Sequence, residues 1–140
     1  EKARLLARVR NEGLSNVTMF PPIEKACIPA FLRSLAIAYI GWQNSPIYRF
    51  GIAPNKLMDY MMAGCAVLHA VSAGNDPVAE SGCGLSVPPE SPQAIAEGIL
   101  KLSELSAAER SAMGKKGAAF VQNAHSYSVL ARRFLDVLQE

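Results

Sequence analysis

The stretch FGIAPNKLMDYMMAGCAVLHAV, residues 50–71, decides the fold. Pro54 suits the first position of a helix, because the N–H group that it lacks would have no partner there and its φ is already helical. Gly64 suits the C-terminal end of that helix. Between them the apolar side chains recur at helical spacing, at Leu57, Met58, Met61 and Met62. The apolar run Ala66–Val71 then predicts a strand buried on both faces, so the stretch indicates a loop, a helix and a strand in succession.

Three further runs predict strands. Leu35–Trp42 is almost continuously apolar, and Gly84–Pro89 is short and closed by prolines. Asn16–Phe20 contains β-branched residues and also ends at a Pro pair, so we expect a buried strand there as well. Strands that are buried on both faces and alternate with helices are typical of a parallel sheet. The expected fold class is therefore α/β, a Rossmann-like doubly wound parallel sheet with right-handed crossovers.

Several side chains mark the expected helix ends. An opening helix ends near Gly13, and Pro29 begins a short helix. Asp76 is predicted to cap another short helix, and Ser106 with Glu109 forms a capping box. In the last helix we expect four apolar side chains to face inward, namely Leu130, Phe134, Leu135 and Leu138.

The composition limits the kinds of partner, metal and cellular compartment that we expect for this chain. The chain has 140 residues, half of them hydrophobic, and a net charge of +2, which fits one packed domain and argues against a nucleic-acid partner. Cys27, Cys65 and Cys83 are scattered among small or apolar neighbours, so we expect buried free thiols in a reducing compartment, the cytoplasm. Neither the cysteines nor His69 and His125 have metal-ligand spacing, so we expect no metal and assign the histidines to packing or capping. No apolar run approaches the roughly 18 residues that a membrane helix needs.

The chain begins inside a helix and without a Met, and the four predicted strands are few for such a domain. We therefore expect a fragment of a longer protein whose first strands lie before Glu1. Missing strands would leave an open sheet edge, which predicts that the fragment pairs with a second copy of itself.

The helix that begins at Pro54 carries the candidate chemistry. Ligands of open parallel sheets bind outside the carboxyl ends of the strands, and the N-terminus of this helix points to that edge. Free N–H groups around Asn55, Lys56 and Leu57 would hold about half a positive charge, and the Lys56 side chain adds a full one. Gly51 permits close approach of the backbone to a ligand. These features predict a site for an anion, with phosphate as the obvious candidate.

Asp59 lies about one turn further along and cannot hold a phosphate. Its carboxylate can accept hydrogen bonds from the adjacent hydroxyl groups of a ribose, so the spacing suits a nucleotide diphosphate. A plainer interpretation stays open: Pro54–Lys56 is only a helix start, and Asp59 forms an ordinary surface pair with Lys56. Gly82–Gly84 could be a second backbone approach to a ligand or a tight turn, and we favour the turn.

Four segments in this order carry a resemblance to a known family: GLSNVTMF (residues 13–20), FGIAPNKLMDYMMAGCAVL (residues 50–68), GNDPVAESGCGLSVPPESPQAIAEGI (residues 74–99) and YSVLARRFLDVL (residues 127–138). Together they resemble the C-terminal half of retaining GT-B glycosyltransferases of family 4. Most similar are the bacterial enzymes of surface-polysaccharide synthesis that carry a PNK signature. The resemblance covers most of the chain.

The resemblance implies that residues 1–140 are a partial nucleotide-sugar-binding domain, with C-terminal helices from about residue 107 packing on it. Many family members carry two glutamates around this helix. The second, which binds ribose, falls on Asp59; the first falls on Gly51, so that carboxylate is absent. The backbone at Asn55–Leu57 would meet the donor diphosphate. The family needs no metal, and no catalytic residue can be assigned.

The implied activity is transfer of a hexosyl or N-acetylhexosaminyl unit from a nucleotide diphosphate sugar, with UDP as the expected nucleotide. The acceptor, a polysaccharide or a lipid-linked saccharide, would bind an N-terminal domain that lies before Glu1, so the fragment alone should be inactive. We expect a cytoplasmic protein that can act peripherally at the inner membrane face. The competing hypothesis is a non-catalytic nucleotide-binding or assembly module of the same fold. A GT-B sugar-nucleotide epimerase would need acidic residues that the sequence does not reveal.

Overall fold

Three parallel strands form the centre of the molecule. The structure, a computed structural model, describes residues 1–139. It contains β1 (Ile37–Gly41), β2 (Ala66–Ala70) and β3 (Gly84–Val87) in the spatial order β1-β2-β3. Ile37 pairs with Ala66 at the start of β1, and Val67 pairs with Gly84 at the start of β3. Every residue of β2 is buried, as expected for a central strand that is covered on both faces. The three apolar runs thus form the predicted strands.

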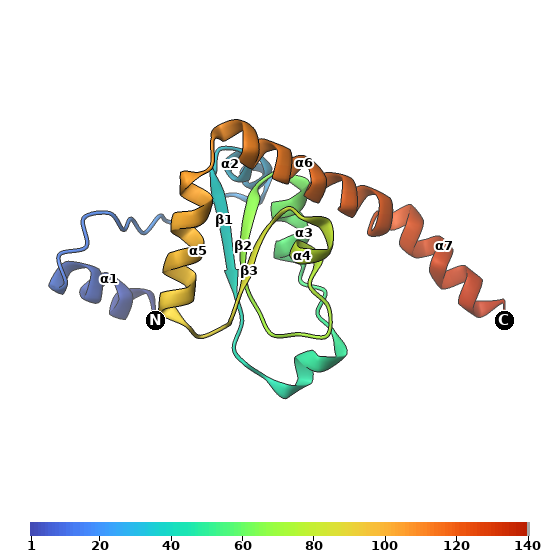
Figure 1. Ribbon diagram of the computed structural model, residues 1–140, viewed down its shortest axis with the longest axis horizontal. Helices are drawn as coiled ribbons and strands as arrows, with labels where there is room; N and C mark the ends of the chain where they lie inside the picture. Colours follow the sequence, from blue (N-terminus) through green and yellow to red (C-terminus); the bar gives the residue numbers. More distant parts are fainter. Residues whose placement is uncertain (140) are drawn as a thin grey trace.

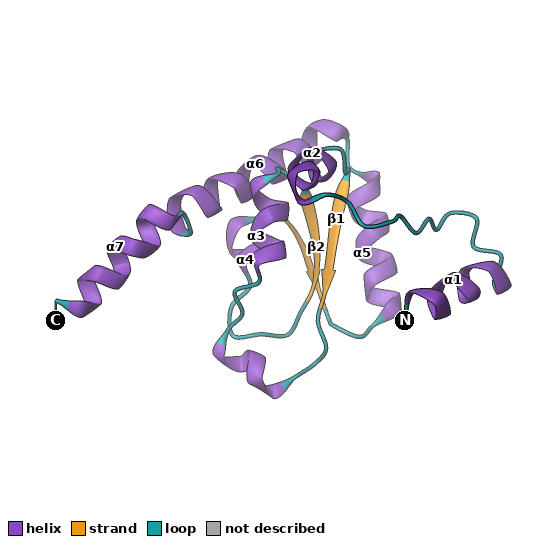
Figure 2. Cartoon of the chain, turned by 180° about the vertical axis from the view of Figure 1, so that it is seen from behind, coloured by secondary structure: helices purple, strands orange, loops and turns teal. Residues whose placement is uncertain are grey.

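Helices cover both faces of this sheet (Figures 1 and 2). One face carries α3 (Asn55–Met62), α4 (Pro77–Ser81) and the long α6 (Ala107–Ala124). The opposite face carries α5 (Pro92–Glu104), which packs on all three strands. A short α2 (Ile28–Arg33), preceded by a 3-10 turn η1 (Lys25–Cys27), lies ahead of β1. The doubly wound α/β class is confirmed.

The main core lies between the sheet and the α3–α6 face. Its members include Leu57 and Met61 from α3, Val67 from β2 and Val78 from α4, all with 0% exposure. The predicted apolar stripe of α3 is therefore divided, because Leu57 and Met61 are buried whereas Met62 is 46% exposed.

Two glycines let α6 approach its neighbours closely. A Cβ atom on Gly114 would overlap the carbonyl oxygen of Gly64, at the turn that follows α3. A Cβ atom on Gly117 would lie 2.9 Å from the Cβ of Cys83. Larger residues at either position would push α6 away from the core.

The predicted helix ends are confirmed where they depend on local contacts. Asp76 accepts hydrogen bonds from the N–H groups of Val78 and Ala79 at the start of α4. Ser106 and Glu109 form the full capping box at the start of α6. Gly64 has a φ of +78°, the left-handed conformation that ends α3.

The strand predicted at Asn16–Phe20 is wrong. This segment lies in the loop between α1 (Lys2–Asn11) and η1, and Phe20 is 65% exposed. No strand within residues 1–139 hydrogen-bonds to it, so its apolar side chains have no sheet to bury them. Figure 1 shows α1 and this loop extending away from the sheet.

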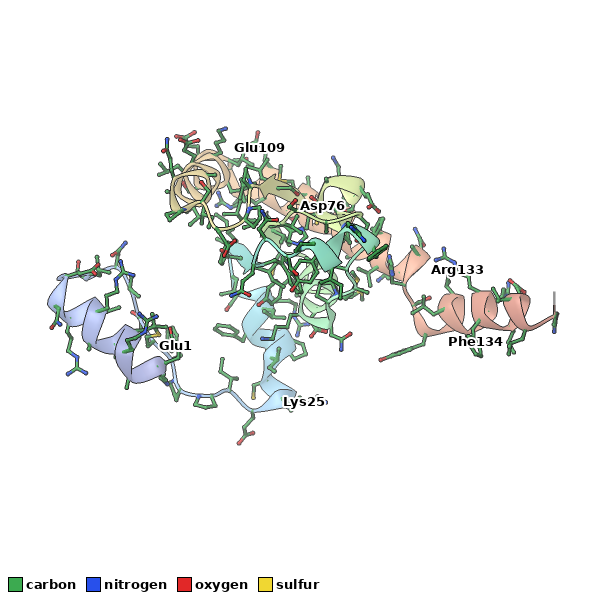
Figure 3. All side chains as sticks on the ribbon, turned by 90° about the horizontal axis from the view of Figure 1, so that it is seen from below. Glu1, Lys25, Asp76, Glu109, Arg133 and Phe134 are labelled. Atoms are coloured by element: carbon green, nitrogen blue, oxygen red, sulfur yellow. The ribbon has the colours of Figure 1, made fainter. Side chains whose placement is uncertain are left out.

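The inward orientation predicted for the last helix is also wrong. The four apolar side chains of α7 (Tyr127–Leu138) that we expected to be buried are exposed, at 42% for Leu130, 65% for Phe134, 55% for Leu135 and 66% for Leu138. The helix projects from the end of α6, and Phe134 lies far from the body of the domain in Figure 3. Nothing in residues 1–139 covers its apolar face.

Of the three cysteines, Cys65 and Cys83 are buried free thiols as expected, but Cys27 is exposed because it lies on η1 at the surface. None of the helices in residues 1–139 combines the length and the apolar composition that crossing a bilayer requires.

Candidate functional site

Two loops meet at the carboxyl ends of the strands. The first runs from Trp42 to Pro54 between β1 and α3 and contains the 3-10 turn η2 (Pro46–Phe50). The second runs from Val71 to Asp76 between β2 and α4. In Figure 1 the strand arrows point toward the end of the molecule where the first loop lies. The N-terminus of α3 opens at the same end, as the sequence predicts.

The first turn of α3 presents free backbone donors. Pro54, which we expected at the first helical position, is instead the N-cap, because its backbone angles are extended (φ −79°, ψ 125°). The helix therefore begins one residue later, at Asn55, and Asn55 and Lys56 are exposed. Within residues 1–139 the N–H groups of Asn55 and Lys56 donate to no backbone acceptor, whereas that of Leu57 donates to the Pro54 carbonyl at 3.1 Å. The buried side chain of Leu57 anchors this turn in the core. Two of the three N–H groups proposed from the sequence are therefore available to an anion.

Asp59 lies further along α3, in a hollow of about 360 Å³ between α3 and α2. Its floor is apolar and includes Ile28, Leu32 and Met62, while Lys25 and Arg33 line it with positive charge. The carboxylate is exposed and thus accessible to a ligand.

The surface pair between Lys56 and Asp59 does not form. The salt bridges among residues 1–139 join Arg4 to Glu1, Arg8 to Glu12 and His69 to Asp76. Both charges on α3 are therefore without an ionic partner in the described chain.

The backbone conformation of the first loop requires a glycine at position 51. Its φ of +104° and ψ of 167° belong to a region that is essentially restricted to glycine. A Cβ atom there would lie 3.2 Å from Oδ1 of Asn75. That oxygen accepts a hydrogen bond from the Ile52 N–H at 2.7 Å, and Asn75 Nδ2 donates to the Ile52 carbonyl at 3.0 Å. Asn75 therefore ties the second loop to the first, immediately ahead of α3.

A second, smaller hollow of about 270 Å³ lies between these loops. Its lining includes Asn44, Ser45, Arg49 and Gly74. The Arg49 guanidinium lies 4.6 Å from the centre of the Phe50 ring, so the cation stacks on an exposed aromatic side chain. The two loops thus line a hollow with polar groups after the carboxyl ends of β1 and β2.

A buried hydrogen-bond relay lies beneath the loops and was not predicted as part of the site. His69 on β2 has 0% exposure. Its Nε2 accepts from Trp42 Nε1 at 3.1 Å, and its Nδ1 lies 2.8 Å from Asp76 Oδ1. The packing or capping role expected for His69 is consistent with this position. The signal in the sequence was a single polar residue within an otherwise apolar central strand.

Asp76 is held in its ionised form. Burial raises the pKa of its carboxyl, but hydrogen bonds from His69 and Ser86 and from the Ala79 N–H outweigh burial and lower the pKa to about 2. The carboxylate is therefore charged at neutral pH and accepts hydrogen bonds without donating any.

Gly82 ends α4 in the left-handed conformation, with a φ of +67°. A Cβ atom on Gly84 would overlap the carbonyl of Val67 on the neighbouring strand. Both glycines thus serve a tight turn and close strand packing, as favoured from the sequence. No cluster of three or more His, Cys, Asp or Glu side chains within residues 1–139 could hold a metal ion.

No family model and no curated protein matches the sequence. Among solved structures, the chain is similar to sucrose-phosphate synthase from Thermosynechococcus elongatus, with a TM-score of 0.80 and 19% sequence identity. The match covers 98% of this chain and 33% of that enzyme, so the chain spans about a third of its length. At this identity the likeness concerns the fold alone. The chain has the parallel α/β fold of one part of a GT-B glycosyltransferase.

Proposed function

We propose that this chain is the donor-binding part of a retaining glycosyltransferase. It would hold a nucleotide diphosphate sugar, with UDP as the nucleotide, while the sugar passes to a polysaccharide or a lipid-linked acceptor. The observation that carries the proposal is the arrangement on α3. Free N–H groups and Lys56 at its tip are followed by the unpaired carboxylate of Asp59.

The tip of α3 would bind the diphosphate. Two free N–H groups and the partial positive charge of the helix N-terminus attract an anion, and the ammonium group of Lys56 strengthens this attraction. The diphosphate gains negative charge as it leaves the sugar. Donors already fixed in place would therefore stabilise the transition state more than the bound substrate.

Asp59 would bind the ribose. A carboxylate accepts hydrogen bonds from two adjacent hydroxyl groups, and bonds to a charged acceptor are stronger than neutral ones. The hollow beside Asp59 has room for part of a nucleoside and offers apolar surface from Ile28 and Leu32. The order along α3 is then diphosphate at the tip and nucleoside toward α2.

The transferred sugar is proposed to be a hexose or an N-acetylhexosamine, and the acceptor to bind a separate domain. On this proposal the chain alone binds the donor without transferring sugar, acts on the cytoplasmic side of the membrane and needs no metal. The open edge of β1 supports pairing with a second copy, which sedimentation at high concentration would detect.

The test is an NMR titration of the chain with UDP, GDP and ADP. We expect saturable binding of UDP, with shifts at the amide groups of residues 55–59. Asp59→Asn should weaken binding by about 10- to 100-fold, because a hydrogen bond to a charged group contributes about 1.5–3 kcal/mol. Asp136→Asn is the matched control, since it removes an exposed aspartate on α7.

Lys56→Gln should weaken UDP binding by about 5- to 30-fold, equivalent to about 1–2 kcal/mol, while uridine binding stays unchanged. Lys115→Gln, an exposed lysine on α6, controls for net charge. Equal effects of the site and control variants would contradict the proposed site, as would the absence of binding by every nucleotide.

A non-catalytic nucleotide-binding module is the second candidate, and the conformation of Gly51 favours it. The carboxylate that the resembled family places at this position is absent, and the glycine-specific backbone leaves no place for one. Comparing UDP with UDP-glucose separates the two functions. A donor site should bind the sugar nucleotide more tightly than UDP, whereas a nucleotide-only module should bind both alike.

A further inference from the structure

The relay formed by Trp42, His69 and Asp76 permits one protonation state of the imidazole. The indole N–H of Trp42 can only donate, so His69 Nε2 must accept and carries no proton. The ionised carboxylate of Asp76 can only accept, so His69 Nδ1 must carry the proton. The buried histidine is therefore neutral, and its ring orientation is fixed from both sides.

Trp42 connects His69 to the first loop. Its ring meets the Tyr48 ring edge-on, with a centroid distance of 5.4 Å. The Tyr48 carbonyl accepts hydrogen bonds from the Gly51 N–H at 2.9 Å and from the Gly74 N–H at 2.8 Å. Residues 48–51 are thus joined to the second loop, and Gly51 lies just ahead of the tip of α3.

Asp76 connects His69 to the second loop. Its Oδ1 also accepts from the Val78 and Ala79 N–H groups, which fixes the start of α4. The neighbouring Asn75 holds the backbone of Ile52 through two hydrogen bonds. One buried imidazole is therefore connected to both loops that lead to the candidate site.

We propose that His69 is a positioning residue for that site: through Trp42 it holds the loop of residues 42–54 so that the α3 tip is preformed for an anionic ligand. This inference rests on the proposed function for its last step, the effect on nucleotide affinity. Its first step, the effect on the loop, is independent of any ligand.

Two substitutions of His69 each keep one of the two hydrogen bonds of the relay and remove the other. The amide nitrogen of His69→Asn takes about the place of Nδ1, which keeps the bond to Asp76 and removes the acceptor for Trp42. The amide oxygen of His69→Gln takes about the place of Nε2, which keeps the acceptor for Trp42. Trp42→Phe removes the donor from a half-buried position and leaves the buried strand unchanged.

The first readout is the indole N–H signal in a ¹H–¹⁵N spectrum, which is unambiguous because the chain has one tryptophan. We expect this signal to move upfield and to exchange faster in His69→Asn, and to stay close to its original position in His69→Gln. The amide signals of residues 48–56 should move in His69→Asn and Trp42→Phe and stay in place in His69→Gln.

The second readout is the dissociation constant for UDP. His69→Asn and Trp42→Phe should each raise it by about 3- to 10-fold, as expected from the loss of one neutral hydrogen bond. The double variant should bind no more weakly than either single variant, because both remove the same contact. His69→Gln should stay within about two-fold of the unmodified chain.

Equal weakening by Asn and Gln at position 69 would overturn the inference, because it would indicate general damage to the core. An unmoved indole signal in His69→Asn would overturn it as well. If the unmodified chain binds no nucleotide, the proposed function fails by itself. The amide signals of residues 48–56 then decide the inference: the expected pattern supports it and unchanged signals overturn it.

Discussion

The side chain of Asn75 satisfies both backbone polar groups of Ile52, accepting from its N–H at 2.7 Å and donating to its carbonyl at 3.0 Å. Asn75→Ala should lower the free energy of unfolding by about 1–3 kcal/mol, because two half-buried backbone groups lose their partners. Urea denaturation would measure the loss. Asn123→Ala, at an exposed position of α6, should change it by less than about 0.5 kcal/mol. Equal losses in the two variants would contradict the role of Asn75.

Gly51 should tolerate no side chain. Gly51→Ala and Gly51→Glu should both destabilise the chain by about 1–3 kcal/mol, since the cost arises from the backbone conformation and not from charge. Thermal unfolding of both variants checks this. A stable Gly51→Glu variant would show that the carboxylate absent from this position can be restored.

Gly114→Ala should destabilise the chain by about 1–3 kcal/mol or more, because its methyl group would overlap the Gly64 carbonyl and force α6 away from α3. Ser111→Ala changes an exposed position of the same helix and should leave the melting temperature nearly unchanged. Similar melting temperatures for the two variants would exclude the close approach of these helices.

Asp76 should make the free energy of unfolding depend on pH. Its pKa is about 2 in the folded chain against 3.8 as its ordinary value, so the unfolded state takes up a proton first as the pH falls. The resulting stabilisation, about 2 kcal/mol at pH 6, should be complete above about pH 5 and fall to about 1 kcal/mol at pH 2.5. The difference in unfolding free energy between the unmodified chain and Asp76→Asn should therefore shrink on acidification. A constant difference would mean that the carboxylate gains nothing from its partners.

The same substitution at two phenylalanines, Phe134 and Phe120, should change the stability by very different amounts. Phe134→Asp on α7 should alter stability by less than about 0.5 kcal/mol, because the ring is exposed. Phe120→Asp on α6 should cost about 1–3 kcal/mol, because this partly buried ring packs against the core and the carboxylate would lose that contact and lie beside apolar side chains. Chemical denaturation compares them directly. A large loss at Phe134 would show that α7 is packed in solution.

Two kinds of feature could be predicted from the sequence: those fixed by contacts within a few residues, and apolar strands that helices of the same chain cover. The helix caps at Asp76 and Ser106 follow from side chains that contact the next turn. The strands β1 to β3 follow from apolar runs whose covering helices lie in the same chain. In each case the partner is close in sequence or present in the described residues.

The failures have the opposite cause. Asn16–Phe20 and α7 are apolar patterns without a surface to cover them in residues 1–139, and a pattern does not reveal whether its partner is present. The relay through His69 was missed because Trp42 precedes it by 27 residues and only the paired register of β1 and β2 brings them together. Asp59 and Lys56 were proposed as site residues from their spacing and stay a prediction, whereas the hollow that α2 forms beside Asp59 could not be predicted from that spacing.

The single oxygen Oδ1 of Asp76 accepts hydrogen bonds both from the start of α4 and from the imidazole of His69. An apolar residue at position 69 would leave the indole N–H of Trp42 without its acceptor and remove one donor from the Asp76 carboxylate. During divergence, positions 42, 69 and 76 should therefore change together. Natural variants of this fold segment should show the three positions co-varying, with an apolar residue at 69 accompanied by a residue without a side-chain donor at 42 and by Ser, Thr or Asn at 76, which can still cap the helix.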